Sequence, residues 1–66
     1  MNIKKLQGKM VEHDISVEML AARMGQHPST LYRKFANPKK ITVGDAALIR
    51  KYVPMSNEDA FDIFLT

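Results

Sequence analysis

Apolar residues in this chain recur at steps of three and four, the spacing that places side chains on one face of an α-helix. The pattern predicts five short helices, over about residues 2–13, 17–24, 28–37 and 43–53, and from residue 57 towards the C-terminus. The sequence contains no run with the strict alternation of apolar and polar residues that is typical of a half-buried strand. We therefore expect an all-α fold, a compact bundle of about five short helices.

Residues suited to helix ends flank these segments. Ser16, Thr42 and Ser56 each precede a predicted helix, where a side-chain hydroxyl accepts a hydrogen bond from a backbone N–H that has no partner within the helix. Thr42 and Ser56 are each followed three residues later by an aspartate, as in a capping box. Gly25 ends the second helix, since glycine adopts the left-handed conformation without strain, and Pro28 suits the first position of the third.

A single small domain must bury most of the apolar residues. The 66 residues form one domain, residues 1–66, and without cysteine neither a disulfide nor a thiolate zinc site adds to its stability. The last helix has an apolar stripe of Phe61, Phe64 and Leu65. Burial in the core is the simpler interpretation of this stripe, and a contact with a second copy or another protein is the alternative. The predicted core elsewhere contains Leu6, Met10, Leu20, Met24, Leu31 and Ile49.

Basic and acidic residues are segregated along the chain. The net charge is only +3, but residues 19–44 contain five basic residues and no acidic one, whereas residues 54–66 contain three acidic residues and no basic one. This segregation predicts one face that attracts a polyanion and another that is turned away from it. The basic residues of the first segment are Arg23, Arg33, Lys34, Lys39 and Lys40.

The second and third predicted helices are joined by very little chain, and three positions around the joint have defined physical roles. A small side chain at Ala21 lets the two helices approach, Gly25 makes the turn, and Leu31 anchors the third helix in the core. This spacing predicts a helix-turn-helix over about residues 17–37. The face of the third helix opposite Leu31 is then free to enter the major groove of DNA, which is wide enough for one α-helix.

The joint resembles the helix-turn-helix of the phage repressor and Cro-type family, through Leu-Ala-Ala-Arg-Met-Gly at residues 20–25 and Ser-Thr-Leu at 29–31. The five-helix layout is similar too, so the likeness covers nearly the whole chain and implies a lambda-repressor-like fold. Two positions depart from the family pattern. Gln26 follows the turn glycine, and Lys34 stands three residues after Leu31, where the family usually has apolar residues. Phe35 comes one step later, and the exact base-facing side of the helix stays open.

The third helix contains the residues that we expect to read DNA bases. At about 100° per residue, Leu31 and Phe35 lie on one side of the helix and Arg33 lies almost opposite them. Arginine reads guanine through paired hydrogen bonds to the N7 and O6 atoms. The predicted base-reading residues are Ser29, Tyr32 and Arg33.

A second group of residues is suited to the phosphate backbone, which fixes the register of a protein on DNA without reading its sequence. His27 precedes the third helix and is expected to cap it and to touch a phosphate. The family resemblance implies that the start of the second helix also contacts the backbone, through Ser16 or through the backbone N–H of Val17. The remaining predicted phosphate contacts are Lys34, Asn37, Lys39 and Lys40.

These features predict a sequence-specific transcriptional regulator, a Cro-like phage repressor that occupies a double-stranded DNA operator. The resemblance implies that it binds as a two-fold dimer on half-sites about one helical turn apart. The main alternative is an antirepressor, which pairs with a partner repressor through the same fold and covers its DNA-reading surface. A less favoured alternative is the antitoxin half of a toxin pair.

Other classes of function find little support in the sequence. No nucleophile motif or glycine-rich phosphate loop is present, so we expect no enzyme and no small-molecule substrate. His13 and His27 are fourteen residues apart without a partner at ligand spacing, and neither a metal nor another cofactor is implied. No segment approaches the ~18 apolar residues that span a bilayer. We expect a protein of the bacterial cytoplasm.

Overall fold

The computed structural model describes residues 1–65, and every regular secondary-structure element in these residues is a helix. This confirms the all-α fold class. The predicted helices are present with ends that differ by at most a few residues, and a 3-10 turn, η1, follows Asn37 where the sequence analysis expected only loop. The elements are α1 (Ile3–Glu12), α2 (Val17–Met24), α3 (Pro28–Ala36), η1 (Pro38–Lys40), α4 (Val43–Tyr52) and α5 (Asn57–Phe64).

The helix ends carry the predicted caps. The side chains of Ser16, Thr42 and Ser56 each accept a hydrogen bond from the backbone N–H three residues on, at 2.9–3.0 Å. Asp45 completes a capping box with Thr42, because its carboxylate accepts the backbone N–H of Thr42. Gly25 ends α2 with a φ of 70°, in the left-handed region that favours glycine.

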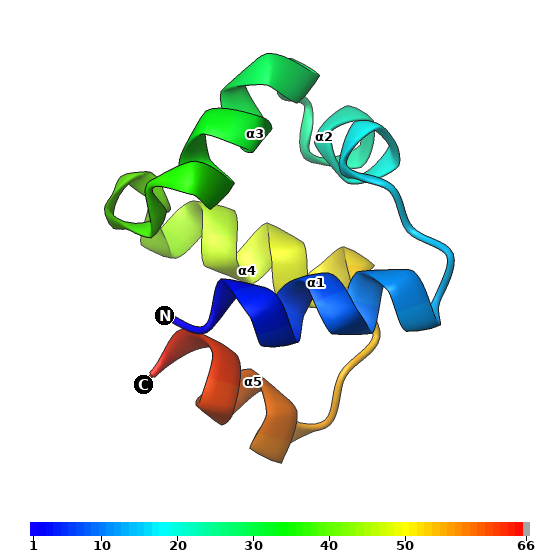
Figure 1. Ribbon diagram of the computed structural model, residues 1–66, viewed down its shortest axis with the longest axis vertical. Coiled ribbons are helices and arrows are strands. Elements are labelled where there is room, and N and C mark those ends of the chain that lie inside the picture. The colour runs from blue at the N-terminus through cyan, green and yellow to red at the C-terminus, as the bar shows by residue number, and fades with distance from the viewer. Residues whose placement is uncertain (66) are drawn as a thin grey trace.

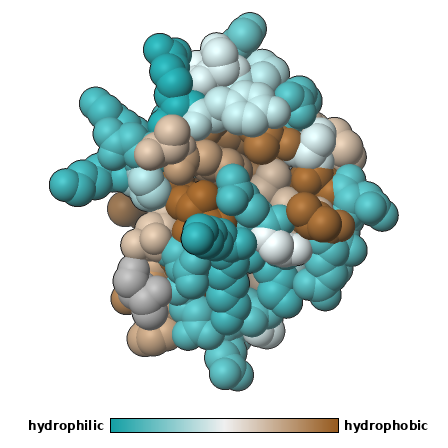
Figure 2. All heavy atoms as spheres, in the orientation of Figure 1, coloured by the Kyte–Doolittle hydropathy of each residue, from teal (hydrophilic) through white to brown (hydrophobic). Residues whose placement is uncertain are grey.

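The helices are arranged with α1 and α4 across the middle, α2 and α3 on one side of them and α5 on the other (Figure 1). The start of α1 and the end of α5 lie close together, and the backbone N–H of Asn2 donates to the carbonyl oxygen of Ile63 at 2.7 Å. In Figure 2, apolar side chains appear between the helices in the middle of this face, while hydrophilic ones project around its edge. None of the helices in residues 1–65 is long and apolar enough to cross a membrane.

The core lies between the helices and confirms the predicted set. All six predicted core residues are at most 7% exposed, and Leu6, Leu20, Leu31 and Ile49 are fully buried. Val53 and Ile63 join them from α4 and α5. Among the described residues, every buried side-chain nitrogen or oxygen atom has a hydrogen-bond partner.

The expected burial of the whole α5 stripe is wrong. Phe61 and Leu65 are 57% and 70% exposed, and Phe64 is only half-buried against the edge of the core. The buried residues of α5 are Ala60 and Ile63. The helix is therefore rotated so that Ala60 and Ile63 face inwards and Phe61 faces outwards. A contact between this stripe and a second copy or partner stays a prediction.

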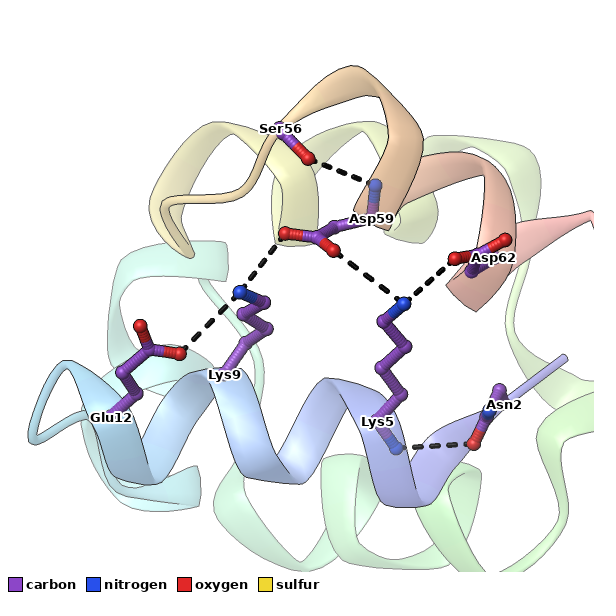
Figure 3. A network of polar contacts seen from close by, with 7 residues as sticks. All are labelled: Asn2, Lys5, Lys9, Glu12, Ser56, Asp59 and Asp62. Atoms are coloured by element: carbon purple, nitrogen blue, oxygen red, sulfur yellow. Dashed lines mark hydrogen bonds and ion pairs between the residues drawn. The ribbon is translucent and has the colours of Figure 1, made fainter.

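Ion pairs between α1 and α5 favour this rotation (Figure 3). Lys5 lies 2.7 Å from a carboxylate oxygen of Asp62, and Lys9 lies 2.9 Å from one of Asp59. The hydrogen bond from Lys9 is the main reason why the pKa of Asp59 is lowered to about 2. Because the acidic side of α5 faces α1, Ala60 and Ile63 point into the core and Phe61 points away from it.

Candidate nucleic-acid interface

A turn of three residues, 25–27, joins α2 to α3, and it packs the two helices against each other. In Figure 1, α2 is seen nearly along its axis while α3 runs across the view, so the helices cross rather than run side by side. The backbone N–H of Gln26 donates to the carbonyl oxygen of Ala21 at 2.9 Å and closes the turn. Ala21 and Leu31 are both fully buried where the helices meet. Gly25 therefore makes the turn and Leu31 anchors α3 in the core, while the assignment of this unit as a DNA-binding helix-turn-helix stays a prediction.

The third helix presents one apolar face to the core and one polar face to solvent. Leu31 and Phe35 are buried, whereas Ser29, Tyr32 and Arg33 are exposed. The predicted phase of α3 is thus confirmed, although contact of these three side chains with bases stays a prediction.

His27 caps α3, as expected. Its Nδ1 atom accepts the backbone N–H of Ser29 at 3.2 Å and lies 2.7 Å from the Ser29 hydroxyl. Because Nδ1 acts as an acceptor, the neutral ring carries its proton on Nε2, which is then the donor available to an external group such as a phosphate. The same contact holds the Ser29 side chain at the start of the helix.

Tyr32 is tied to α2 by a contact that the sequence analysis missed. Its hydroxyl donates to a carboxylate oxygen of Glu18 at 2.6 Å, and both side chains are exposed. The hydrogen bond lowers the pKa of Glu18 and raises that of Tyr32. The bond brings the start of α2, with Ser16 and Val17, to the same side of the molecule as the exposed face of α3. It also places a negative charge there.

Lys34 is paired with a carboxylate within the protein, whereas a phosphate contact needs an ammonium group that faces solvent. Its ammonium nitrogen is 2.8 Å from a carboxylate oxygen of Asp45 on α4 and 3.2 Å from the side-chain oxygen of Gln26. Gln26 in turn donates to the other carboxylate oxygen of Asp45 at 2.6 Å. The two departures from the family pattern thus share one acidic partner. We therefore leave Lys34 out of the candidate phosphate-binding set.

Asp45 is the one buried charged residue among those described, with 6% exposure. Burial alone would raise its pKa, but hydrogen bonds from Lys34, from the Thr42 backbone and from Gln26 outweigh that effect and lower the pKa to about 2. From the sequence, Asp45 was predicted only as part of a helix cap. Its burial depends on how α4 packs against the α2–α3 unit, which the sequence pattern does not show.

The other candidate phosphate contacts are distributed around α3. Asn37, Lys39 and Lys40 are exposed at its C-terminal end, where η1 keeps the two lysines next to the helix. Ser16 is exposed at the start of α2, and Val17 is half-buried. A shallow hollow beside α3 is lined by Thr30, Arg33, Lys34 and Lys40. Thr30 is a lining residue that the sequence analysis did not select.

We compared the chain with models of known families, with curated proteins and with solved structures, and none of them matches it.

Proposed function

We propose that this protein is a sequence-specific DNA-binding transcriptional regulator, a Cro-like phage repressor that acts by occupying its operator. The observation that carries the proposal is the exposed face of α3. Leu31 and Phe35 anchor the helix from behind, and Arg33 projects on the opposite side with Ser29 and Tyr32. A helix held this way fits the DNA major groove, and an arginine at its centre suits a guanine.

The charges around α3 support the same role. Lys39 and Lys40 follow the helix in η1, and His27 stands at its start, where its Nδ1 atom is occupied by Ser29 and Nε2 is left for an external acceptor. These groups flank the candidate reading face at both ends, which is the arrangement that fixes a helix in a groove through the phosphates on either side. Ser16 and the first backbone N–H groups of α2 are a further phosphate contact on this side.

A dimer and a cellular location belong to the same proposal. A two-fold dimer on half-sites about one helical turn apart doubles the contacts available to so small a domain. As a regulator of bacterial or phage genes, the protein acts in the cytoplasm of the bacterial host.

The proposal is tested by selecting duplexes from a random pool and measuring affinity for the selected and for random sequences at several salt concentrations. A regulator gives a selected sequence that is bound at least ~10³-fold more tightly than random DNA, with affinity that falls as salt rises. Equal affinity for all sequences, or no binding at low salt, contradicts it.

One observation favours the antirepressor as a second candidate. Glu18 places a carboxylate directly beside Tyr32, on the face that DNA phosphates would approach. An acidic group there repels DNA and suits a basic protein surface, such as that of a partner repressor. Binding to a purified repressor, with no selected duplex sequence, identifies this function.

A further inference from the structure

Three polar side chains meet at a single point between the turn, α3 and α4. Gln26 donates to one carboxylate oxygen of Asp45 at 2.6 Å, and Lys34 donates to the other at 2.8 Å. Lys34 and Gln26 also contact each other at 3.2 Å. We call these three residues the Asp45 junction. It links the turn and α3, which make up most of the candidate DNA-binding surface, to a helix that lies behind them.

The Asp45 junction is largely closed to solvent. The side chain of Asp45 is 7% exposed and that of Lys34 is 20% exposed. A buried ion pair adds little net stability, because desolvation of the charges offsets their attraction, but it is strongly disfavoured when one partner loses the other. Such a pair therefore constrains geometry more tightly than an apolar contact, which accommodates small rotations of a helix.

Asp45 is itself held in place independently of α3. Its carboxylate accepts the backbone N–H of Thr42 at 3.0 Å, and its own backbone N–H donates to the Thr42 hydroxyl at 2.9 Å. This capping box fixes the carboxylate to the first turn of α4. Lys34 and Gln26 are thus oriented by the Asp45 carboxylate, and the capping box at the start of α4 fixes the position of that carboxylate.

We propose that the Asp45 junction sets the rotation of α3 about its own axis, and thereby determines which side chains of α3 meet base edges. Lys34 is then a positioning residue that acts through Arg33, its neighbour in the chain, and it makes no contact with phosphate. This inference rests on the proposed function in DNA binding, because its effect is expressed as a preference for particular bases.

The two roles of Lys34 make opposite predictions. A phosphate contact weakens binding to all sequences alike and contributes about one to the salt slope of the affinity. A positioning residue leaves the salt slope unchanged and alters the base preference. The two quantities are measured in the same titration, so each role is recognised by its own result.

The test variant is Lys34→Met combined with Asp45→Asn. It removes one positive and one negative charge, so the net charge stays at +3. Asparagine can still cap α4 and bond to Gln26, and methionine fills the space of the lysine stem. We expect Lys34→Met alone to melt at a lower temperature, because it leaves the Asp45 carboxylate without its cation, and we expect the double variant to regain most of that loss.

In the double variant, we expect the ratio of affinities for selected and random duplexes to fall by at least about tenfold, with the salt slope of the wild type. Lys39→Met is the matched control, since it removes a lysine from an exposed position just beyond α3. It should lower the affinity for all duplexes and reduce the slope by about one. Gln26→Leu removes the two hydrogen bonds of Gln26 in the junction while leaving the ion pair, and it should shift the base preference less.

Wild-type base preference in both the double variant and Gln26→Leu overturns the inference, as does a reduced salt slope in the double variant. If the wild-type protein binds no duplex, the proposed function fails, and the junction is tested without DNA. Amide NMR resonances of α3 should then move in the double variant while those of α1 and α5 stay in place. Unchanged α3 resonances would mean that the junction does not orient the helix.

Discussion

The hydroxyl of Tyr32 on α3 donates a 2.6 Å hydrogen bond to the carboxylate of Glu18 on α2, across the exposed face that we propose for DNA. The bond fixes an aromatic ring at the edge of this face and holds a negative charge beside it. Its two partners are fourteen residues apart in the chain. If the protein binds DNA as proposed, we expect Tyr32 to contribute to affinity through its position and Glu18 through its charge.

Glu18→Gln keeps a hydrogen-bond acceptor for Tyr32 and removes the charge. We expect affinity for all duplexes to rise a few-fold, because a carboxylate near phosphates costs on the order of 1 kcal/mol at low salt. The gain should shrink as salt screens the repulsion. Fluorescence anisotropy with selected and random duplexes measures it, and Glu12→Gln, on an exposed position of α1, is the control. Weaker DNA binding by Glu18→Gln would show that the carboxylate does not face the backbone.

Arg33 and the lysines of η1 should differ in what they contribute. If Arg33 reads a guanine, Arg33→Ala costs ~1–3 kcal/mol on the selected duplex and relaxes the preference at one base pair. Lys39→Ala and Lys40→Ala should instead weaken binding to every sequence and lower the salt slope by about one each. Salt titrations of the three variants check this division. Equal losses for all three on every duplex would remove Arg33 from the specificity residues.

Leu31 should dominate the stability of the α2–α3 unit. Its side chain is fully buried where the two helices meet. Leu31→Ala removes that packing and leaves a cavity, which costs ~2–5 kcal/mol and is enough to unfold a domain of this size. Circular dichroism melts measure the loss, with Val11→Ala at a 76% exposed position as the control. A melting temperature equal to that of the wild type would mean that Leu31 contributes no core packing.

Acid should destabilise the fold through two carboxylates. The pKa values of Asp45 and Asp59 are both lowered to about 2, Asp45 by hydrogen bonds that outweigh its burial and Asp59 first by the bond from Lys9. Groups with a lowered pKa stabilise the folded state above their unfolded pKa of about 3.9, and this contribution is lost as the pH falls through about 2.

We therefore expect the melting temperature to stay level between pH 7 and 5 and to fall between pH 4 and 2. Asp59→Asn should flatten part of this fall, while Asp14→Asn, at an exposed site in the turn after α1, should not. A melting temperature that is independent of pH down to 2 would contradict the role of both carboxylates.

The outward-facing part of α5 should govern self-association. Phe61 is 57% exposed and lines, with Ala46, Ala47 and Ala60, a shallow apolar groove between α4 and α5. If a dimer forms through this groove, Phe61→Ser should dissociate it while leaving the melting temperature of the monomer nearly unchanged. Sedimentation measures the mass, and Val11→Ser, which removes an exposed apolar side chain from α1, is the control. A variant with the mass of the wild-type dimer excludes Phe61 from the interface.

Much of this fold was predictable from local pattern. The helices, the caps at Ser16 and Thr42, the left-handed Gly25 and the buried face of α3 follow from residues within a few positions of one another. Helix periodicity, hydroxyl capping and glycine conformation act over one or two turns of the chain, so a single sequence contains all the information they need. The candidate DNA-reading face could be inferred for the same reason, because it is the side opposite Leu31 and Phe35.

The partners of polar side chains that lie far apart in the chain were decided only by the tertiary structure. Lys34 was expected to face phosphates, but α4 places Asp45 within 2.8 Å of its ammonium group, and a buried carboxylate is strongly disfavoured without a paired cation. The stripe of α5 was expected inside, but Lys5 and Lys9 on α1 hold the acidic side of that helix and turn Phe61 outwards. Periodicity determined which helices form and which face of α3 is buried, whereas the rotation of α5 and the partner of Lys34 depend on charges that meet only when distant segments pack together.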